Sequence, residues 1–327
     1  MYISLVSRSP VVTSAELIAG FVPPPHFDDV SFDNYLPDPT QPTQTQALAN
    51  LRDFCQRINS PKKFWQRKDS SQQGRYLDGG FGVGKTHLLA ALWHGVEAPK
   101  VFGTFVEYTN LVGALGFNET VNQLQEFKLI CIDEFELDDP GDTVLMSTLL
   151  MRLVERGVYL AATSNTLPDR LGEERFAAED FQREIQGLAA HFENIRVDGD
   201  DYRHRGIPKA IDSSSDDELQ NYANQNQAVS LDSFRDLSLH LSTLHPSKYR
   251  ALVSGLSAVC VSQLETITDQ AIALRWVVLA DRLYDQDIKV LTSGVKLDEL
   301  FAPELLKGGY RKKYRRALSR LIALSQL

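Results

Sequence analysis

A glycine-rich octapeptide constrains the fold of this chain more than any other feature. It spans residues 79–86, reads GGFGVGKT and matches the pattern GxxxxGK[ST]. Glycines let the backbone turn so tightly that successive N–H groups and a helix N-terminus converge on phosphate oxygens. An apolar strand pattern precedes the octapeptide and a helical pattern follows it, as such a loop requires. The sequence therefore predicts a phosphate-binding loop between a strand and a helix.

Each position of this loop has an expected role. Lys85 would reach the β- and γ-phosphates of a nucleotide, and the hydroxyl of Thr86 would complete the shell of a Mg²⁺ ion. The backbone N–H groups of the preceding positions would surround the phosphates; these are Gly79, Gly80, Phe81, Gly82, Val83 and Gly84. We therefore expect ATP and Mg²⁺ as cofactors.

Two later apolar runs end in polar side chains. The strand expected over 127–133 ends in Asp133 and Glu134; Asp133 would hold Mg²⁺ directly or through water, and Glu134 would polarise the water that attacks the γ-phosphate. A second carboxylate at this place favours hydrolysis over phosphoryl transfer to a small molecule. The strand expected over 158–164 is followed by Asn165, which in isolation is a turn residue. Beside the acidic strand it would orient the attacking water or sense the γ-phosphate.

The alternation of strands and helices between about 75 and 208 is typical of a parallel α/β sheet. Gly95 and Gly157 directly follow two helical patterns, as C-terminal capping residues do. The other strands expected in this region are 75–78, 102–106 and 194–197. The helices expected between the strands are 85–94 and 142–156.

Composition divides the chain into four parts. We expect an N-terminal arm over 1–60, a nucleotide-binding core over 61–209, a polar linker over 210–229 and a smaller, α-rich domain over 230–327. In the last part, the patterns predict helices near 231–244, 269–284 and 309–324 and strands near 258–264 and 289–293. The linker is nearly free of large apolar residues, so we interpret it as a solvated loop.

The N-terminal arm carries Phe32, Tyr35 and Pro42 ahead of a helical pattern over 46–58. Two interpretations stay open for these side chains. They pack against an adenine ring, or they make ordinary core contacts.

Charge and composition narrow the class of protein. The 34 basic and 43 acidic residues give a net charge of −9, which disfavours general nucleic-acid binding but leaves a local basic patch open. Arg8, Pro10 and Glu16 interrupt the N-terminal apolar runs before they reach the length of an export signal, and no apolar run is long enough to span a bilayer. The three cysteines form no CxxC pair. We therefore expect a cytoplasmic protein without a transmembrane segment.

Beyond the phosphate-binding loop, a set of short motifs resembles one family. They are IDEF at 132–135, ATSN at 162–165, RF at 175–176, VDG at 197–199, DYR at 201–203, Arg275, Leu279, Tyr284, the strand 289–293 and ALSRL at 317–321. Together they are similar to the ZapE family of AAA+ ATPases, which includes a bacterial cell-division factor and mitochondrial AFG-type ATPases. The resemblance covers roughly residues 70–325.

The resemblance implies an AAA+ fold, with a P-loop NTPase core built as an αβα sandwich, a C-terminal lid and assembly into a homo-oligomeric ring. In such rings an arginine of the neighbouring subunit stabilises charge on the γ-phosphate. Arg175 best matches that residue, and Arg170 is the fallback. Arg275 matches a family arginine that contacts nucleotide from the lid in the same subunit; the other interpretation is a salt-bridged helix residue beside Asp281 and Arg282.

The family also implies a partner and a setting. ATP hydrolysis would remodel a protein partner, either in bacterial cell division, through the tubulin-like protein of the division ring, or in mitochondrial membrane-protein quality control. The lack of a targeting segment favours the bacterial setting. The polar insert at 210–228 and the short segment after 95 depart from better-known members of the family, and elements that contact the partner would lie there.

Three alternatives remain. The first is a helicase-loader-like AAA+ ATPase that contacts single-stranded DNA through its basic C-terminus; the second is a nucleotide-gated scaffold with little turnover. A small-molecule P-loop kinase is disfavoured by Asp133, Glu134 and Asn165. The basic residues of the C-terminus alternate with an apolar set at helical spacing, Tyr314, Ala317, Leu318, Leu321 and Ile322, which favours the outer face of a packed helix over a nucleic-acid site.

Overall fold

The computed structural model describes residues 2–60, 73–80, 82–135, 140–165, 187–199 and 212–327. Its contacts divide the chain into two compact units, one over Ser14–His204 and one that joins Met1–Thr13 to Arg205–Leu327. The arm expected over 1–60 is therefore shared between the two units.

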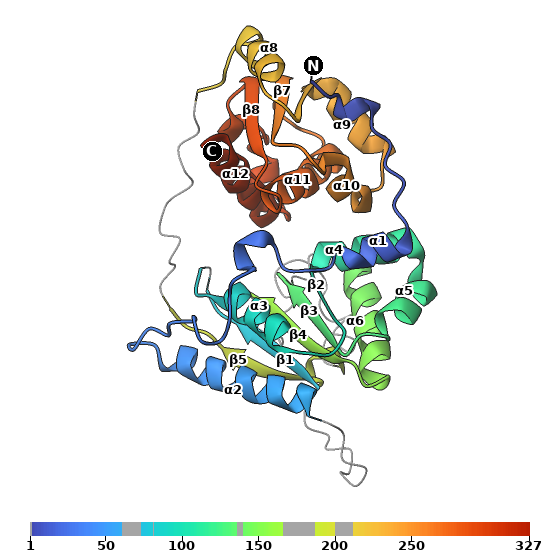
Figure 1. The fold of residues 1–327 in the computed structure, drawn as a ribbon, viewed down its shortest axis with the longest axis vertical. Helices are drawn as coiled ribbons and strands as arrows, with labels where there is room; N and C mark the ends of the chain where they lie inside the picture. Colours follow the sequence, from blue (N-terminus) through green and yellow to red (C-terminus); the bar gives the residue numbers. More distant parts are fainter. Residues whose placement is uncertain (1, 61–72, 81, 136–139, 166–186, 200–211) are drawn as a thin grey trace. The chain divides into compact units, whose positions relative to one another are not determined.

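The unit over Ser14–His204 is built on a parallel sheet, as the sequence predicts. Among the described residues the sheet has five strands in the order β2-β3-β4-β1-β5 (Figure 1). Every pairing is parallel, so the carboxyl ends of all the strands lie along one edge. The strands are β1 (Gly74–Asp78), β2 (Lys100–Thr104), β3 (Leu129–Asp133), β4 (Tyr159–Ser164) and β5 (Phe192–Arg196).

Helices cover both faces of this sheet. Alternate strand residues point to opposite faces, so Leu77 and Cys131 pack with α2 and α3 while Tyr76 and Ile132 pack with α4, α5 and α6. Burying both faces explains why the central strands β3 and β4 read as nearly continuous apolar runs. The helices among the described residues of this unit are α1 (Ser14–Ala19), the 3-10 turn η2 (Pro25–Phe27), α2 (Pro42–Asn59), α3 (Lys85–Gly95), α4 (Phe105–Leu115), α5 (Phe117–Leu124) and α6 (Pro140–Glu155).

The strand expected over 102–106 ends earlier, at Thr104, because a helix begins there. The side chain of Thr104 accepts a hydrogen bond from the N–H of Glu107 at 3.3 Å, and the Glu107 carboxylate accepts one from the N–H of Thr104 at 2.8 Å. This reciprocal capping box satisfies two N–H groups that the start of a helix leaves unpaired. The chain therefore turns helical at Phe105 despite the β-favouring side chains that follow.

The second unit carries its own small parallel sheet, with three strands in the order β6-β7-β8 among the described residues (Figure 1). Its elements are η1 (Leu5–Ser7), α8 (Asp216–Gln225), β6 (Val229–Ser233), α9 (Phe234–Thr243), η5 (Pro246–Lys248), α10 (Tyr249–Val253), β7 (Ala258–Leu264), α11 (Gln270–Tyr284), β8 (Lys289–Gly294), η6 (Leu297–Glu299), η7 (Leu305–Lys307) and α12 (Arg311–Ser325). The strands predicted near 258–264 and 289–293 and the helices predicted near 269–284 and 309–324 are confirmed. The helix predicted near 231–244 begins only at Phe234, because the residues before it form the strand β6. The helices α8 and α10 and the 3-10 turns were not predicted.

The polar stretch interpreted as a loop contains the helix α8, so that expectation is wrong for its central residues. Ser215 and Glu218 form a capping box at its start. Leu219 and Ala223, one helical turn apart, are fully buried in a small cluster with strand residues of β6 and β7. Two apolar residues on one face are thus enough to attach an otherwise polar helix to the sheet.

The N-terminal residues extend this sheet beyond β6. The N–H of Ile3 donates to the carbonyl oxygen of Val229 at 2.9 Å, and the carbonyl oxygen of Ile3 accepts from the N–H of Leu231 at 3.0 Å. The carboxylate of Asp232 accepts hydrogen bonds from the Ser4 hydroxyl at 2.5 Å and the Leu5 N–H at 2.8 Å. These bonds explain why Met1–Thr13 belongs to the second unit.

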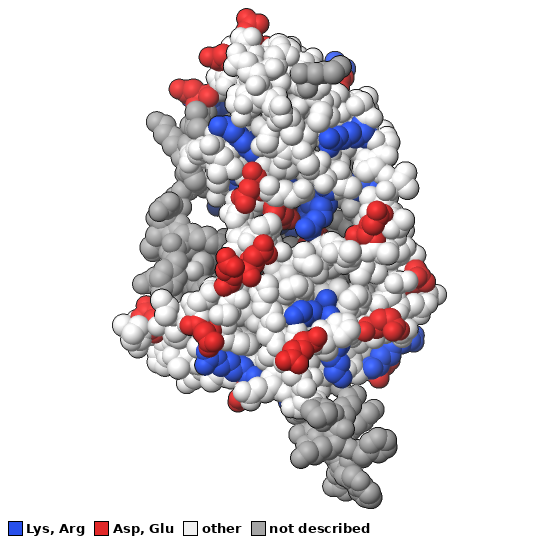
Figure 2. Space-filling view, in the orientation of Figure 1, with Lys and Arg blue, Asp and Glu red and all other residues white. Residues whose placement is uncertain are grey.

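None of the helices in the described part of the chain combines the length and the apolar character needed to cross a membrane. On the face drawn in Figure 2, acidic and basic side chains are interspersed.

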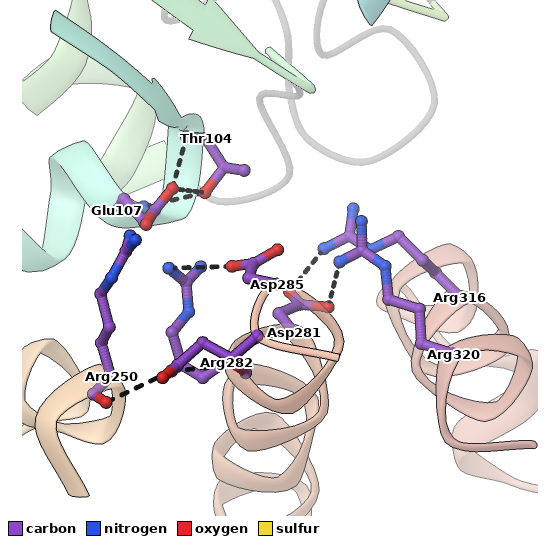
Figure 3. A network of polar contacts seen from close by, with 9 residues as sticks. Thr104, Glu107, Arg250, Asp281, Arg282, Asp285, Arg316 and Arg320 are labelled. Carbon is purple, nitrogen blue, oxygen red and sulfur yellow. Dashed lines mark hydrogen bonds and ion pairs between the residues drawn. The ribbon is translucent and has the colours of Figure 1, made fainter. Parts of the chain in front are cut away.

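The basic C-terminal segment forms α12, whose apolar face is buried as its spacing predicts. Two of its cations, Arg316 and Arg320, pair with Asp281 of α11, with 3.0 Å between Arg316 Nη2 and Asp281 Oδ2 (Figure 3). Burial alone would raise the pKa of Asp281, but the guanidinium groups of Arg316, Arg320 and Arg282 overcome it and lower that pKa to about 2. Arg316 and Arg320 therefore help to hold α12 on α11.

We expect the stability of the second unit to depend on this carboxylate. Because the folded-state pKa of Asp281 is about 2 against 3.8 for the free group, its contribution is complete above pH 4 and is lost as the pH falls toward 2. The shift corresponds to about 2 kcal/mol. Hydrogen exchange of the α11 and α12 amides, measured from about pH 5 downward, should show that loss in the native chain and a flatter pH dependence in Asp281→Asn. Parallel losses in the two proteins would contradict the assignment.

Candidate active site

The glycine-rich loop joins the end of β1 to the start of α3, as the sequence predicts. Gly84, the N-cap residue of α3, has a φ of +89°, which favours glycine. A Cβ atom on Gly84 would lie 2.9 Å from the ring of Tyr35, and one on Gly79 would lie 2.1 Å from the carbonyl oxygen of Val197. Both positions therefore exclude larger residues, and the loop leads into a helix N-terminus that favours an anion.

Lys85 begins α3 and is only 8% exposed. Its ammonium group donates to the carbonyl oxygens of Gly79 and Gly80, at 3.0 and 2.5 Å. A third acceptor, Oδ1 of Asn165, lies 3.1 Å away. The cation is thus held between the glycine-rich loop and the end of β4.

Thr86 and Asp133 meet across the first turn of α3 and the end of β3. The Thr86 hydroxyl lies 3.1 and 3.2 Å from the two carboxylate oxygens of Asp133. A hydroxyl and a carboxylate are hard oxygen donors, of the kind that Mg²⁺ takes together with water and nucleotide phosphates. The residues present therefore fit a Mg²⁺ ion.

Glu134 follows Asp133 in a left-handed backbone conformation, with a φ of +55°. Its N–H donates to the hydroxyl of Thr163 on β4 at 3.0 Å. The prediction that β4 neighbours the acidic strand is confirmed, because β3 and β4 pair directly. The structure therefore gathers Lys85, Thr86, Asp133, Glu134 and Asn165 at the carboxyl edge of one sheet.

The N-terminal arm lies alongside α3, from the last residue of this helix to the glycine-rich loop. Tyr35 is buried next to Gly84, and its ring centre lies 5.3 Å from that of His87. Phe32 lies near Gly95, the last residue of the same helix. Tyr35 is thus the arm's aromatic residue beside the glycine-rich loop, whereas Phe32 makes a core contact.

Two buried side chains that were not predicted from the sequence form hydrogen bonds or ion pairs next to the glycine-rich loop. Gln44, 1% exposed, donates to the carbonyl oxygen of Asp198 at 2.8 Å and accepts from the N–H of Asp38 at 2.8 Å. Asp78, the residue before the loop, pairs with Arg196 of β5 at 2.5 Å. Gln44 belongs to α2 and Asp78 ends β1. The sequence around neither residue indicates which distant group its side chain contacts.

Three predicted site residues, Phe81, Arg170 and Arg175, lie outside the described residues. Arg275 is described and belongs to the second unit. Its Nη1 donates to the carbonyl oxygens of Leu241 and Leu244, at 2.7 and 2.9 Å, where α9 ends. In this arrangement Arg275 satisfies carbonyl groups that the end of a helix leaves unpaired.

Comparison with known proteins identifies relatives for nearly the whole chain. The model of the AFG1-like ATPase family matches residues 11–229 and 218–327. Cell division protein ZapE of Escherichia coli K12 is 26% identical over 309 residues, which cover 79% of this chain and 80% of that protein. Lactation elevated protein 1 homolog B of Danio rerio is 25% identical over 213 residues, covering 54% of this chain and 42% of that protein.

Among solved structures, the AMPPCP-bound DnaA of Aquifex aeolicus is similar with a TM-score of 0.42 and 11% identity, covering 70% of this chain and 63% of that one. The family match extends over both units of the fold. It confirms the resemblance that the sequence motifs indicate. The chain belongs to the AFG1-like ATPase family.

Proposed function

We propose that this protein binds ATP with Mg²⁺ at the glycine-rich loop and hydrolyses it. The observation that carries the proposal is the meeting of a buried lysine, a hydroxyl–carboxylate pair, a second carboxylate and an amide at one sheet edge. This set supplies a phosphate-binding cation, oxygen donors for a metal and a base for water.

The loop would hold the phosphates through its backbone N–H groups and through Lys85. In the structure the Lys85 ammonium group contacts two backbone carbonyl oxygens of the loop. Phosphate oxygens carry more negative charge than carbonyl oxygens, so bound ATP would compete for the same N–H donors. Thr86 and Asp133 would hold Mg²⁺, which would neutralise negative charge on the phosphates.

Glu134 would accept a proton from the attacking water, and Asn165 would orient that water. The amide of Asn165 already contacts Lys85 at 3.1 Å, so a γ-phosphate bound by Lys85 would come within reach of the same amide. The two residues approach the site from neighbouring strands, β3 and β4. This arrangement favours water over a second substrate as the acceptor of the phosphoryl group.

We further propose that turnover occurs in a homo-oligomeric ring, in which Arg175 of one subunit, or Arg170, stabilises the transition state in its neighbour. The family and the sequence motif around Arg175 support this part. Arg275 would contact nucleotide from its own subunit; in the structure its Nη1 donates to the carbonyl oxygens of Leu241 and Leu244.

The similarity to cell division protein ZapE supports a role in bacterial cell division. We propose a cytoplasmic location for this role. We propose that hydrolysis remodels a protein partner there, the tubulin-like protein of the division ring. No contact with nucleic acid is included in this proposal, because the acidic net charge disfavours it and two of the C-terminal cations are paired with Asp281.

Steady-state ATP hydrolysis measured against protein concentration tests the proposal. Specific activity should rise with concentration, because each site needs an arginine from a second subunit. Arg175→Ala and Glu134→Gln should each be inactive alone and partly active when mixed, since a mixed interface contains one intact glutamate and one intact arginine. Activity that is independent of concentration and of Arg175 would favour a monomeric enzyme; no hydrolysis at any concentration would leave a nucleotide-gated scaffold.

A further inference from the structure

One buried hydroxyl contacts both acidic residues of the candidate site. Thr163 is the penultimate residue of β4, and it is 2% exposed. Its Oγ1 is 2.5 Å from Oδ1 of Asp133 and 3.0 Å from the backbone nitrogen of Glu134. The sequence analysis includes Thr163 in the ATSN motif but assigns it no role, because it stands inside an apolar strand.

The direction of these two hydrogen bonds follows from their chemistry. A backbone N–H can only donate, so the Thr163 hydroxyl accepts from Glu134. A hydroxyl has a single proton, which therefore goes to the carboxylate of Asp133. One side chain thus donates to one member of the acidic pair and accepts from the other.

The backbone of Thr163 also stabilises the turn after β3, which contains Glu134. Its carbonyl oxygen accepts from the N–H of Phe135 at 2.7 Å. Glu134, between the two bonded positions, has a φ of +55°, a left-handed conformation that is unfavourable for a non-glycine residue. Phe135 is 1% exposed and packs edge-on against Tyr76 and Phe105. The turn after β3 is therefore held by hydrogen bonds on both sides of its unfavourable residue.

We propose that Thr163 is a positioning residue for ATP hydrolysis. Its hydroxyl orients the Asp133 carboxylate toward the metal site shared with Thr86, and it fixes the turn that directs Glu134. The inference rests on the proposed ATPase function and adds to it the residue that couples the two carboxylates. Valine has nearly the same shape as threonine but can make neither bond, whereas serine can make both.

The test compares Thr163→Val with Thr163→Ser in the full chain. Because it alters the support of the metal and base residues and leaves the phosphate loop intact, Thr163→Val should lower kcat by about 10–100-fold and raise the Mg²⁺ concentration needed for half-maximal rate. KM and the affinity for ATP should change little. Thr163→Ser should retain activity near that of the native chain. Thr163→Cys, whose thiol is a weak donor, should be intermediate, and it keeps the test open if Thr163→Val fails to fold.

A matched control removes a buried hydroxyl elsewhere in the same unit. Thr120 of α5 is fully buried and donates to the carbonyl oxygen of Gly116 at 2.8 Å. Thr120→Val should lower the thermal stability and leave kcat and the Mg²⁺ requirement unchanged. A purely structural role for Thr163 would give the same pattern, with reduced stability and unaltered Mg²⁺ dependence.

The outcomes separate the inference from the function on which it rests. If the native chain does not hydrolyse ATP, the proposed function is wrong. If the native chain is active and the Val and Ser variants have equal kcat values, whether high or low, the hydroxyl is not what matters and the inference is overturned. A loss confined to ATP affinity would overturn it as well.

Discussion

Replacing Lys85 with alanine should abolish nucleotide binding, with the Kd for ATP raised by about 100-fold or more. The ammonium group is nearly buried and points its donors at the loop carbonyls and at Asn165. Without it, the β- and γ-phosphates would enter a site that has lost a charge-assisted hydrogen-bond donor, and their negative charge would be poorly compensated.

Titration with a fluorescent ATP analogue measures this effect directly. Lys100→Ala is the matched control, because Lys100 lies in the same unit and also donates to two carbonyl oxygens, those of His94 at 3.3 Å and Val96 at 2.5 Å. The control should bind nucleotide like the native chain. Native-like binding by Lys85→Ala would show that the glycine-rich loop is not the nucleotide site.

The parts of this molecule that sequence predicts are those fixed by neighbours along the chain. The loop between β1 and α3 is recognisable because its glycines meet local conformational demands, as the φ of Gly84 shows. Asp133 and Asn165 are recognisable because each ends an apolar run. Parallel strands then bring the two ends to one edge, a consequence of fold class alone.

The parts that sequence does not predict depend on contacts between distant segments. Thr163 reaches Asp133 only because β3 and β4 pair in one particular register. Ser4 and Asp232 are separated by most of the sequence. The residues next to either of them therefore do not indicate that the N-terminus belongs to the second unit. The helix α8 buries only Leu219 and Ala223, too few apolar residues for a periodic signal, although its capping box was present in the sequence.

Replacing Glu134 with glutamine should leave ATP binding intact and lower kcat by about 10²–10⁴-fold, the usual contribution of a general base. Glutamine has nearly the same size as glutamate, and the backbone N–H that donates to Thr163 is unchanged, so the turn after β3 should keep its geometry. What the variant loses is a carboxylate able to accept a proton from water.

Single-turnover hydrolysis, with the protein in excess over ATP and concentrated enough to saturate binding, separates this loss from any effect on binding. Glu119→Gln, on the exposed face of α5, makes the same chemical change away from the site and should hydrolyse ATP at the native rate. Native turnover by Glu134→Gln would remove the glutamate from the role of base, and weakened ATP binding would mean that it contacts nucleotide instead.

The Glu134→Gln variant also tests whether Thr163 of β4 acts on hydrolysis through Glu134, which follows β3. If Thr163 works partly by directing Glu134, then adding Thr163→Val to Glu134→Gln should lower kcat by less than it does in the native chain, because the base it directs is already absent. The effect that remains in the double variant is the part exerted through Asp133 and the metal, and it should appear as a raised Mg²⁺ requirement. Full additivity would mean that Thr163 and Glu134 act independently, and the hydrogen bond between them at 3.0 Å would then serve the fold of the turn alone.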